Sequence, residues 1–225
     1  MDWQALLVTL KLDLVVCVLL LIIGVPIALW LAFSGWRWKF MVEAVVALPL
    51  VLPPTVLGFY MLLAMGPRSP LGKAYGWIWG QGLPFTFTGL AIASMVYSLP
   101  FMVQPIAAAF ASVDPKLISA SEVLGASRWR TLVRVIFPLS IGGLLTGLVL
   151  TFAHTLGEFG VVLMVGGNIP GVTRTVSIAI YDSVESLNYA SAGQTSLVLL
   201  VASFLILSIL YALNRSAIAV WPGKR

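Results

Sequence analysis

Two ionisable side chains inside an apolar stretch are the residues of this sequence best placed to do chemistry. His154 and Glu158 are four positions apart, so on a helix they would lie on nearly the same face. Ionisable groups within a membrane segment usually face a bundle interior or a water-filled cavity. Either the pair lines a polar pathway, or a mutual hydrogen bond fixes the helix geometry. A fixed carboxylate would repel an anion unless His154 or Arg174 offset its charge.

Catalytic and nucleotide-binding patterns do not accompany this pair. The sequence has one histidine and one cysteine, which excludes a His-rich metal site and a disulfide within the chain. The nearest approach to a phosphate-binding loop runs from Gly66 to Lys73. Five residues separate its glycines where four are needed, and Ala74 replaces the required hydroxyl residue. We therefore expect no catalytic residue, metal or cofactor in this chain.

The composition defines the kind of elements that must position these groups. Of the 225 residues, 60% are hydrophobic and 9% are charged, and the mean hydropathy is +1.03. Soluble domains are about 45–50% apolar and about 25% charged, so a soluble or disordered chain is excluded. The net charge of +5 is carried by dispersed basic residues, which argues against a nucleic-acid partner. We expect an all-α polytopic membrane protein.

Five charge-poor stretches are long enough to cross a bilayer core of about 30 Å. They cover approximately residues 14–34, 44–65, 85–111, 135–157 and 195–213. Residues 168–190 contain a turn and a short amphipathic stretch, for which we predict a re-entrant or interfacial helix. No internal repeat or linker divides the chain, so we treat residues 1–225 as a single transmembrane domain.

The basic residues predict the orientation, because cytoplasmic loops of membrane proteins are enriched in Lys and Arg. With the N-terminus outside, nine of the 13 basic residues fall on the inner side and four on the outer side. The inner set is Arg37, Lys39, Lys116, Arg128, Arg130, Arg134, Arg215, Lys224 and Arg225. The outer set is Lys11, Arg68, Lys73 and Arg174. This count favours an N-out/C-in topology.

The inner loop at residues 112–134 has signals for two short helices. Asp114 and Pro115 are typical of an N-cap followed by the first helical position. Gly125 suits a left-handed residue after the first helix, and Ser127 suits the N-cap of the second. A solvated loop with ordinary inner charges is one interpretation. The alternative is a docking element, because the apolar side chains of this loop need a partner surface.

The same loop carries a resemblance to a known family. Residues 119–125 read Ser-Ala-Ser-Glu-Val-Leu-Gly, and Val-Ile-Phe-Pro follows nine residues later. This resembles the EAA loop of bacterial ABC importer permeases: Glu-Ala-Ala, three residues, Gly, nine residues, Ile-x-Leu-Pro. Ser119 replaces the Glu and Ser121 the second Ala. By resemblance, the residues that couple to the ATPase are Ser119, Ala120, Ser121, Glu122, Val123, Leu124, Gly125, Ala126, Arg128, Trp129 and Arg130.

Four further stretches are similar to the molybdate permease (ModB) family. They lie at residues 48–58, 124–130, 156–160 and 168–175. The resemblance implies an ABC importer type I permease fold in the cell inner membrane, with a second copy of the chain forming the pathway. It also implies a cytoplasmic ABC ATPase dimer that holds ATP and Mg, and an extracytoplasmic molybdate-binding protein. Tungstate or sulfate is the alternative substrate, and an ion-coupled secondary carrier is the alternative class.

An oxyanion pathway needs hydrogen-bond donors without a deep trap. Interior prolines break helices, and broken helices at membrane depth are tolerated where the backbone lines a cavity. The pathway candidates are Pro53, Pro54, Thr55, Thr151, His154, Glu158 and Asn168. A kinked packing helix is the alternative explanation for the prolines. If the pathway interpretation is right, Thr55→Val and Thr151→Val impair uptake without preventing assembly.

Overall fold

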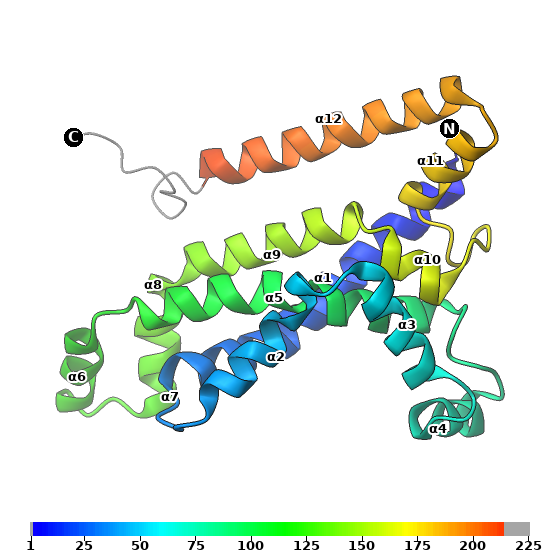
Figure 1. Cartoon of the computed structure of the whole chain (residues 1–225). Coiled ribbons are helices and arrows are strands. Elements are labelled where there is room, and N and C mark those ends of the chain that lie inside the picture. Colours follow the sequence, from blue (N-terminus) through cyan, green and yellow to red (C-terminus); the bar gives the residue numbers. More distant parts are fainter. Residues whose placement is uncertain (1, 214–225) are drawn as a thin grey trace.

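The computed structural model describes residues 2–213, and every regular element in this range is helical. This confirms the all-α class (Figure 1). The helices are α1 (Trp3–Phe33), α2 (Lys39–Val51), α3 (Pro54–Met65), α4 (Pro70–Trp79), α5 (Phe87–Ala111), α6 (Pro115–Val123), α7 (Arg128–Thr131), the π-helical turn η1 (Leu132–Ile136), α8 (Phe137–Leu139), α9 (Ile141–Leu156), α10 (Gly160–Gly166), α11 (Val176–Glu185) and α12 (Tyr189–Leu213).

The first helix starts earlier than the sequence pattern predicts. Asp2 caps α1 by accepting a hydrogen bond from the Ala5 amide at 3.0 Å, and the helix continues to Phe33. Asp13 therefore lies within the helix rather than in a segment before it, and its side chain is fully buried.

The predicted second span is broken into two helices. The chain bends by 114° between α2 and α3, around Leu52 and Pro53, and Pro54 is the first residue of α3. A second bend of 67° separates α9 from the helical segment that ends at Leu139. Three of the described helices (α1, α5 and α12) are long and apolar enough to cross a membrane, or up to five spans exist if each bent pair counts as one.

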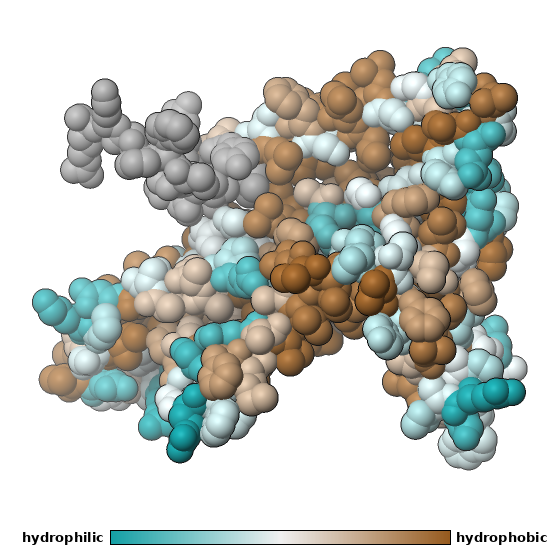
Figure 2. All heavy atoms as spheres, in the orientation of Figure 1, coloured by the Kyte–Doolittle hydropathy of each residue, from teal (hydrophilic) through white to brown (hydrophobic). Residues whose placement is uncertain are grey.

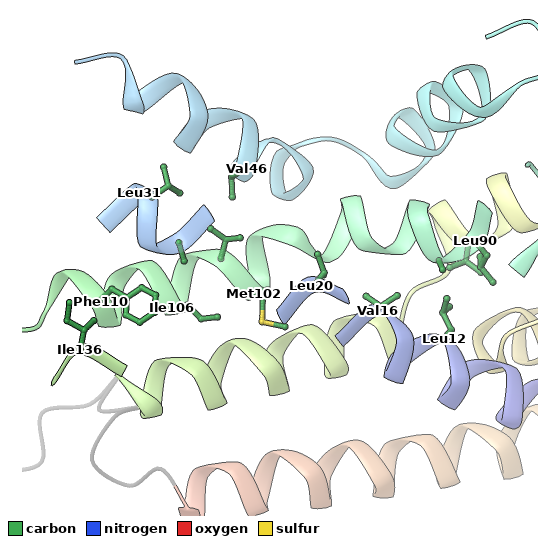
Figure 3. Packing of buried hydrophobic residues seen from close by; sticks show 14 of the residues in the cluster. Leu12, Val16, Leu20, Leu31, Val46, Leu90, Met102, Ile106, Phe110 and Ile136 are labelled. Atoms are coloured by element: carbon green, nitrogen blue, oxygen red, sulfur yellow. The ribbon is translucent and has the colours of Figure 1, made fainter. Parts of the chain in front are cut away.

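The core lies where α1, α5 and α9 pack side by side (Figure 3). Leu12 and Leu20 of α1 and Met102 and Phe110 of α5 are almost completely buried there. Glycines bring α9 close to α5: a Cβ built on Gly147 would lie 2.9 Å from the carbonyl oxygen of Met102. Two glycines spaced four apart in α9 allow this close helix approach.

Hydrophilic residues gather at opposite ends of the molecule, with hydrophobic residues between them (Figure 2). α6 and α7 lie at one end, and α4 and α11 lie at the other (Figure 1). α12 packs loosely, since only 11% of its apolar window is buried within the chain. Such an exposed apolar helix requires lipid or another protein chain around it.

Candidate functional site

The loop between α5 and α9 forms the two helices that its sequence predicts. The Lys116 amide donates to the Asp114 carboxylate at 2.9 Å, which caps α6. Gly125 follows with a φ of +76°, in the left-handed region that favours glycine. The Arg130 amide then donates to the Ser127 hydroxyl at 3.3 Å and caps α7. The local predictions for this loop are therefore confirmed.

Ser121 has a structural role that the family pattern does not anticipate. Its hydroxyl contacts the Thr131 hydroxyl at 2.8 Å, and it also lies 2.8 Å from the Ile118 carbonyl oxygen. An alanine at this position would make neither hydrogen bond. The serine therefore links α6 to α7, so the two helices are held at a defined angle by side chains as well as by the Gly125 turn.

The tip of this loop presents apolar side chains to its surroundings. Val123 and Leu124 are each 87% exposed, and Trp129 is 72% exposed. Ser119, Ala120, Glu122, Gly125, Arg128 and Arg130 are also exposed, whereas Ser121 and Ala126 are partly buried. We call these exposed residues between Ser119 and Arg130 the coupling face. An apolar centre surrounded by charged residues is typical of a protein interface.

The proposed pathway residues do not form one cluster in this chain. Pro53, Pro54 and Thr55 are exposed at the bend between α2 and α3, and Asn168 is exposed in the turn after α10. Thr151 and Glu158 are instead buried. The bend does contact the start of α10, because a Cβ built on Gly160, the first residue of α10, would lie 2.6 Å from the Cβ of Pro54.

His154 makes a different hydrogen bond from the one considered in the sequence. Its Nδ1 lies 2.9 Å from the Ser98 hydroxyl of α5, and its ring stacks on Phe101 with centroids 4.1 Å apart. Ser98 also contacts Thr155 at 2.9 Å. The Glu158 oxygens have no hydrogen-bond partner among the described residues, so the mutual His154–Glu158 bond is not formed. His154 instead joins α9 to α5.

The turn between α10 and α11 ties the N-terminal part of α1 to the rest of the molecule. Arg174 pairs with Asp182 at 2.6 Å and with Asp2 at 3.4 Å. The Val176 amide donates to the Thr9 hydroxyl of α1 at 2.9 Å. Arg174 therefore shares its charge between these two carboxylates, and it forms no ion pair with Glu158 in the described part of the chain.

Sequence reasoning missed Asp13, which is buried on the face of α1 that contacts α5 and α9. The sequence nevertheless contains a pattern that could have identified this residue. Thr9, Asp13 and Cys17 follow at four-residue steps and form a polar or small-residue line along an otherwise apolar helix. All three side chains are buried.

Comparison with known proteins complements this geometry. Residues 24–218 match the model of the family described as "Binding-protein-dependent transport system inner membrane component". The chain is 49% identical to the molybdenum transport system permease protein ModB of Azotobacter vinelandii over 95% of both chains. It is 34% identical to a probable sulfate transport system permease protein of Zygnema circumcarinatum, over 84% of this chain and 67% of that one.

A solved structure shares the fold. The crystal structure of a bacterial alginate ABC transporter, in complex with an alginate pentasaccharide-bound periplasmic protein, matches with a TM-score of 0.76 at 18% identity. The match covers 94% of this chain and 77% of that chain. This likeness confirms the architecture of an ABC importer permease for the chain.

Proposed function

Because this chain belongs to the family of binding-protein-dependent transport system inner membrane components, it is a multi-pass permease subunit of an ABC importer, and we propose that its substrate is molybdate. The observation that supports molybdate is the 49% identity to a molybdenum permease over nearly the whole length. The identity to the sulfate permease is lower and covers less of both chains. Sulfate and tungstate are therefore the competing substrates to test.

The coupling face is the part of the chain that suits an ATPase partner. Its exposed Val123, Leu124 and Trp129 would be covered by the docked partner, which removes apolar surface from water. Arg128 and Arg130 flank this apolar centre and can contact acidic residues of the partner. ATP and Mg then belong to a separate ATPase dimer. When that dimer closes, α6 and α7 transmit the movement to the rest of the permease.

The pathway is completed by a second copy of the chain. The loose packing of α12 and the exposed residues of the α2–α3 bend leave faces that this chain does not cover. In this arrangement, ATP binding closes the ATPase dimer and opens the permease outward, and hydrolysis restores the inward state. A periplasmic binding protein delivers the oxyanion at the end that carries α4 and α11.

The distribution of basic residues supports an orientation with the N-terminus outside. Of the six inner basic residues from Arg37 to Arg134, Arg37 lies in the α1–α2 turn, Lys39 begins α2, and the other four lie in the segment from α6 to η1. Arg68, Lys73 and Arg174 belong to segments at the opposite end. Arg215, Lys224 and Arg225, which also support this count, lie outside the described residues.

Molybdate specificity can be tested with the complete transporter in liposomes. The permease, its ATPase and its binding protein are reconstituted, and ATP hydrolysis and uptake are measured with molybdate, tungstate or sulfate at equal concentrations. We expect molybdate to stimulate both activities most strongly. Stimulation by sulfate alone would contradict the substrate assignment. Uptake by the permease without ATPase or ATP would instead identify an ion-coupled carrier.

Thr55 is an exposed hydroxyl donor at the broken helix. It is exposed in the first turn of α3, whereas the Thr151 hydroxyl would need to become accessible in another state of the cycle. A hydrogen bond to a charged group contributes about 1.5–3 kcal/mol, so Thr55→Val should reduce uptake at low molybdate about tenfold or more. Thr88→Val is the matched control, because Thr88 is exposed in the first turn of α5. Equal uptake by the two variants would contradict a role for Thr55.

A further inference from the structure

Two carboxyl groups lie buried without partners where α1, α5 and α9 meet. Asp13 of α1 is fully buried, and Glu158, just beyond the end of α9, is 4% exposed. None of their four carboxyl oxygens has a hydrogen-bond partner among residues 2–213. Each is therefore a buried polar group that the described part of the chain leaves unpaired. The two groups are close enough for their charges to interact.

Two buried hydroxyl groups belong to the same region. Cys17 lies 3.9 Å from the carbonyl oxygen of Leu148, and α1 and α9 run in opposite directions (Figure 1). Asp13 lies one turn before Cys17 in α1. Because the two helices are antiparallel, Asp13 lies opposite the residue one turn after Leu148 in α9, at the level of Thr151. The hydroxyl groups of Thr151 and Ser94 are both buried and unpartnered. Ser94 lies beside the Glu158 carboxyl group without a well-aligned hydrogen bond.

No basic side chain compensates this pair within the described part of the chain. Lys11 lies 4.4 Å from the centroid of the Phe87 ring, and Arg174 is engaged by Asp2 and Asp182. His154 bonds to Ser98. The remaining titratable neighbours are the Cys17 thiol near Asp13 and the Tyr97 phenol near Glu158. Thiols and phenols are neutral or negative, so neither can balance a carboxylate charge.

Protonation of the two carboxyl groups accounts for all of these observations. Two ionised carboxylates without a counter-charge are strongly disfavoured in a buried site, and their mutual repulsion adds to that cost. A protonated carboxyl group is neutral and gains an O–H donor. We propose that Asp13 and Glu158 form a buried proton-binding site, in which both carboxyl groups hold their protons and are neutral.

A metal ion fits this site less well than protons do. Among residues 2–213, no group of three or more His, Cys, Asp or Glu side chains is arranged to hold a metal ion. Protonation also removes negative charge from a helix junction of the permease. The site therefore does not repel an anion, which answers the electrostatic objection to a carboxylate in an oxyanion permease. The proposal does not depend on which oxyanion is transported.

Infrared spectroscopy of the full-length permease in lipid nanodiscs tests the proposal directly. At neutral pH we expect a protonated-carboxyl C=O band that shifts when H₂O is replaced by D₂O. Asp13→Asn with Glu158→Gln should remove the band, and Glu43→Gln should retain it, because Glu43 is an exposed carboxylate. If the double variant does not fold, each single variant should remove about half of the band.

The pH dependence of the same band shows which results would contradict the proposal. Ordinary carboxyl groups lose their protons near pH 4, whereas the two buried carboxyl groups should keep the band at neutral pH. A wild-type protein without the band at neutral pH would overturn the proposal. A band that appears only after sodium and divalent cations are removed would also overturn it, since a metal ion would then occupy the site.

Discussion

Replacing Gly125 with tryptophan is expected to abolish ATP-driven uptake while the permease still inserts into the membrane. Gly125 has a φ of +76° and lies between α6 and α7, with no atom within 4 Å of the position that a Cβ would take. A residue with a side chain has a conformational energy about 1–2 kcal/mol higher in this left-handed region. The indole would also project into the coupling face. Co-purification of the ATPase and uptake into liposomes measure the loss.

Gly80 provides the matched control for this substitution. It has a φ of +68°, its surroundings are equally open, and it ends α4 at the opposite end of the molecule. Gly80→Trp therefore introduces similar backbone strain away from the coupling face, and ATPase binding should persist. If the Gly125→Trp transporter assembles and imports substrate, our interpretation of the loop is wrong. Equal loss of ATPase co-purification in both variants would point to backbone strain alone.

Gly143→Leu is expected to prevent stable packing of α9 against α5. A Cβ on Gly143 would meet the Ala109 side chain and would lie 2.8 Å from the carbonyl oxygen of Pro105. The carbonyl belongs to the backbone of α5, so it cannot move aside as a flexible side chain would. Overpacking typically costs about 1–3 kcal/mol and occasionally more. Thermal unfolding of the detergent-purified permease should show a clear loss of stability relative to wild type.

Gly193→Leu controls for the effect of leucine in a helix. Gly193 belongs to α12, and no atom lies within 4 Å of a Cβ built there. Both substitutions gain helix propensity by replacing glycine, but only the one at Gly143 creates a clash. The Gly193 variant should therefore unfold at or above the wild-type temperature. Indistinguishable unfolding of the two variants would refute the tight α5–α9 contact.

Local signals in the coupling loop were read correctly from the sequence. Asp114, Gly125 and Ser127 each act on backbone groups within three residues, so their effects require no knowledge of distant elements. The break at Pro53 and Pro54 was foreseeable for the same reason, because proline removes a backbone donor and clashes with the preceding turn. Which angle the two helices adopt depends on packing, as the contact between Pro54 and Gly160 illustrates.

The partners of the ionisable groups could not be derived in this way. His154 and Glu158 are four residues apart in sequence, yet His154 bonds to Ser98 on another helix. Asp13 and Glu158 are far apart in sequence, yet the fold buries both of them without a hydrogen-bond partner among the described residues. Spacing along a helix indicates which side chains share a face, and it contains no information about the helix opposite that face.

Composition, periodic apolar stretches and capping residues were sufficient to determine a helical membrane chain with a short helix-turn-helix loop at one end. Lipid-compatible composition and backbone hydrogen bonding are local properties, so they are encoded in contiguous segments. Tertiary structure alone decided that α1 extends through Asp13, that Gly143 and Gly147 meet α5, and that two carboxyl groups are buried together. These outcomes depend on packing between distant segments, because neighbouring helices determine which side chains lose water and which find partners.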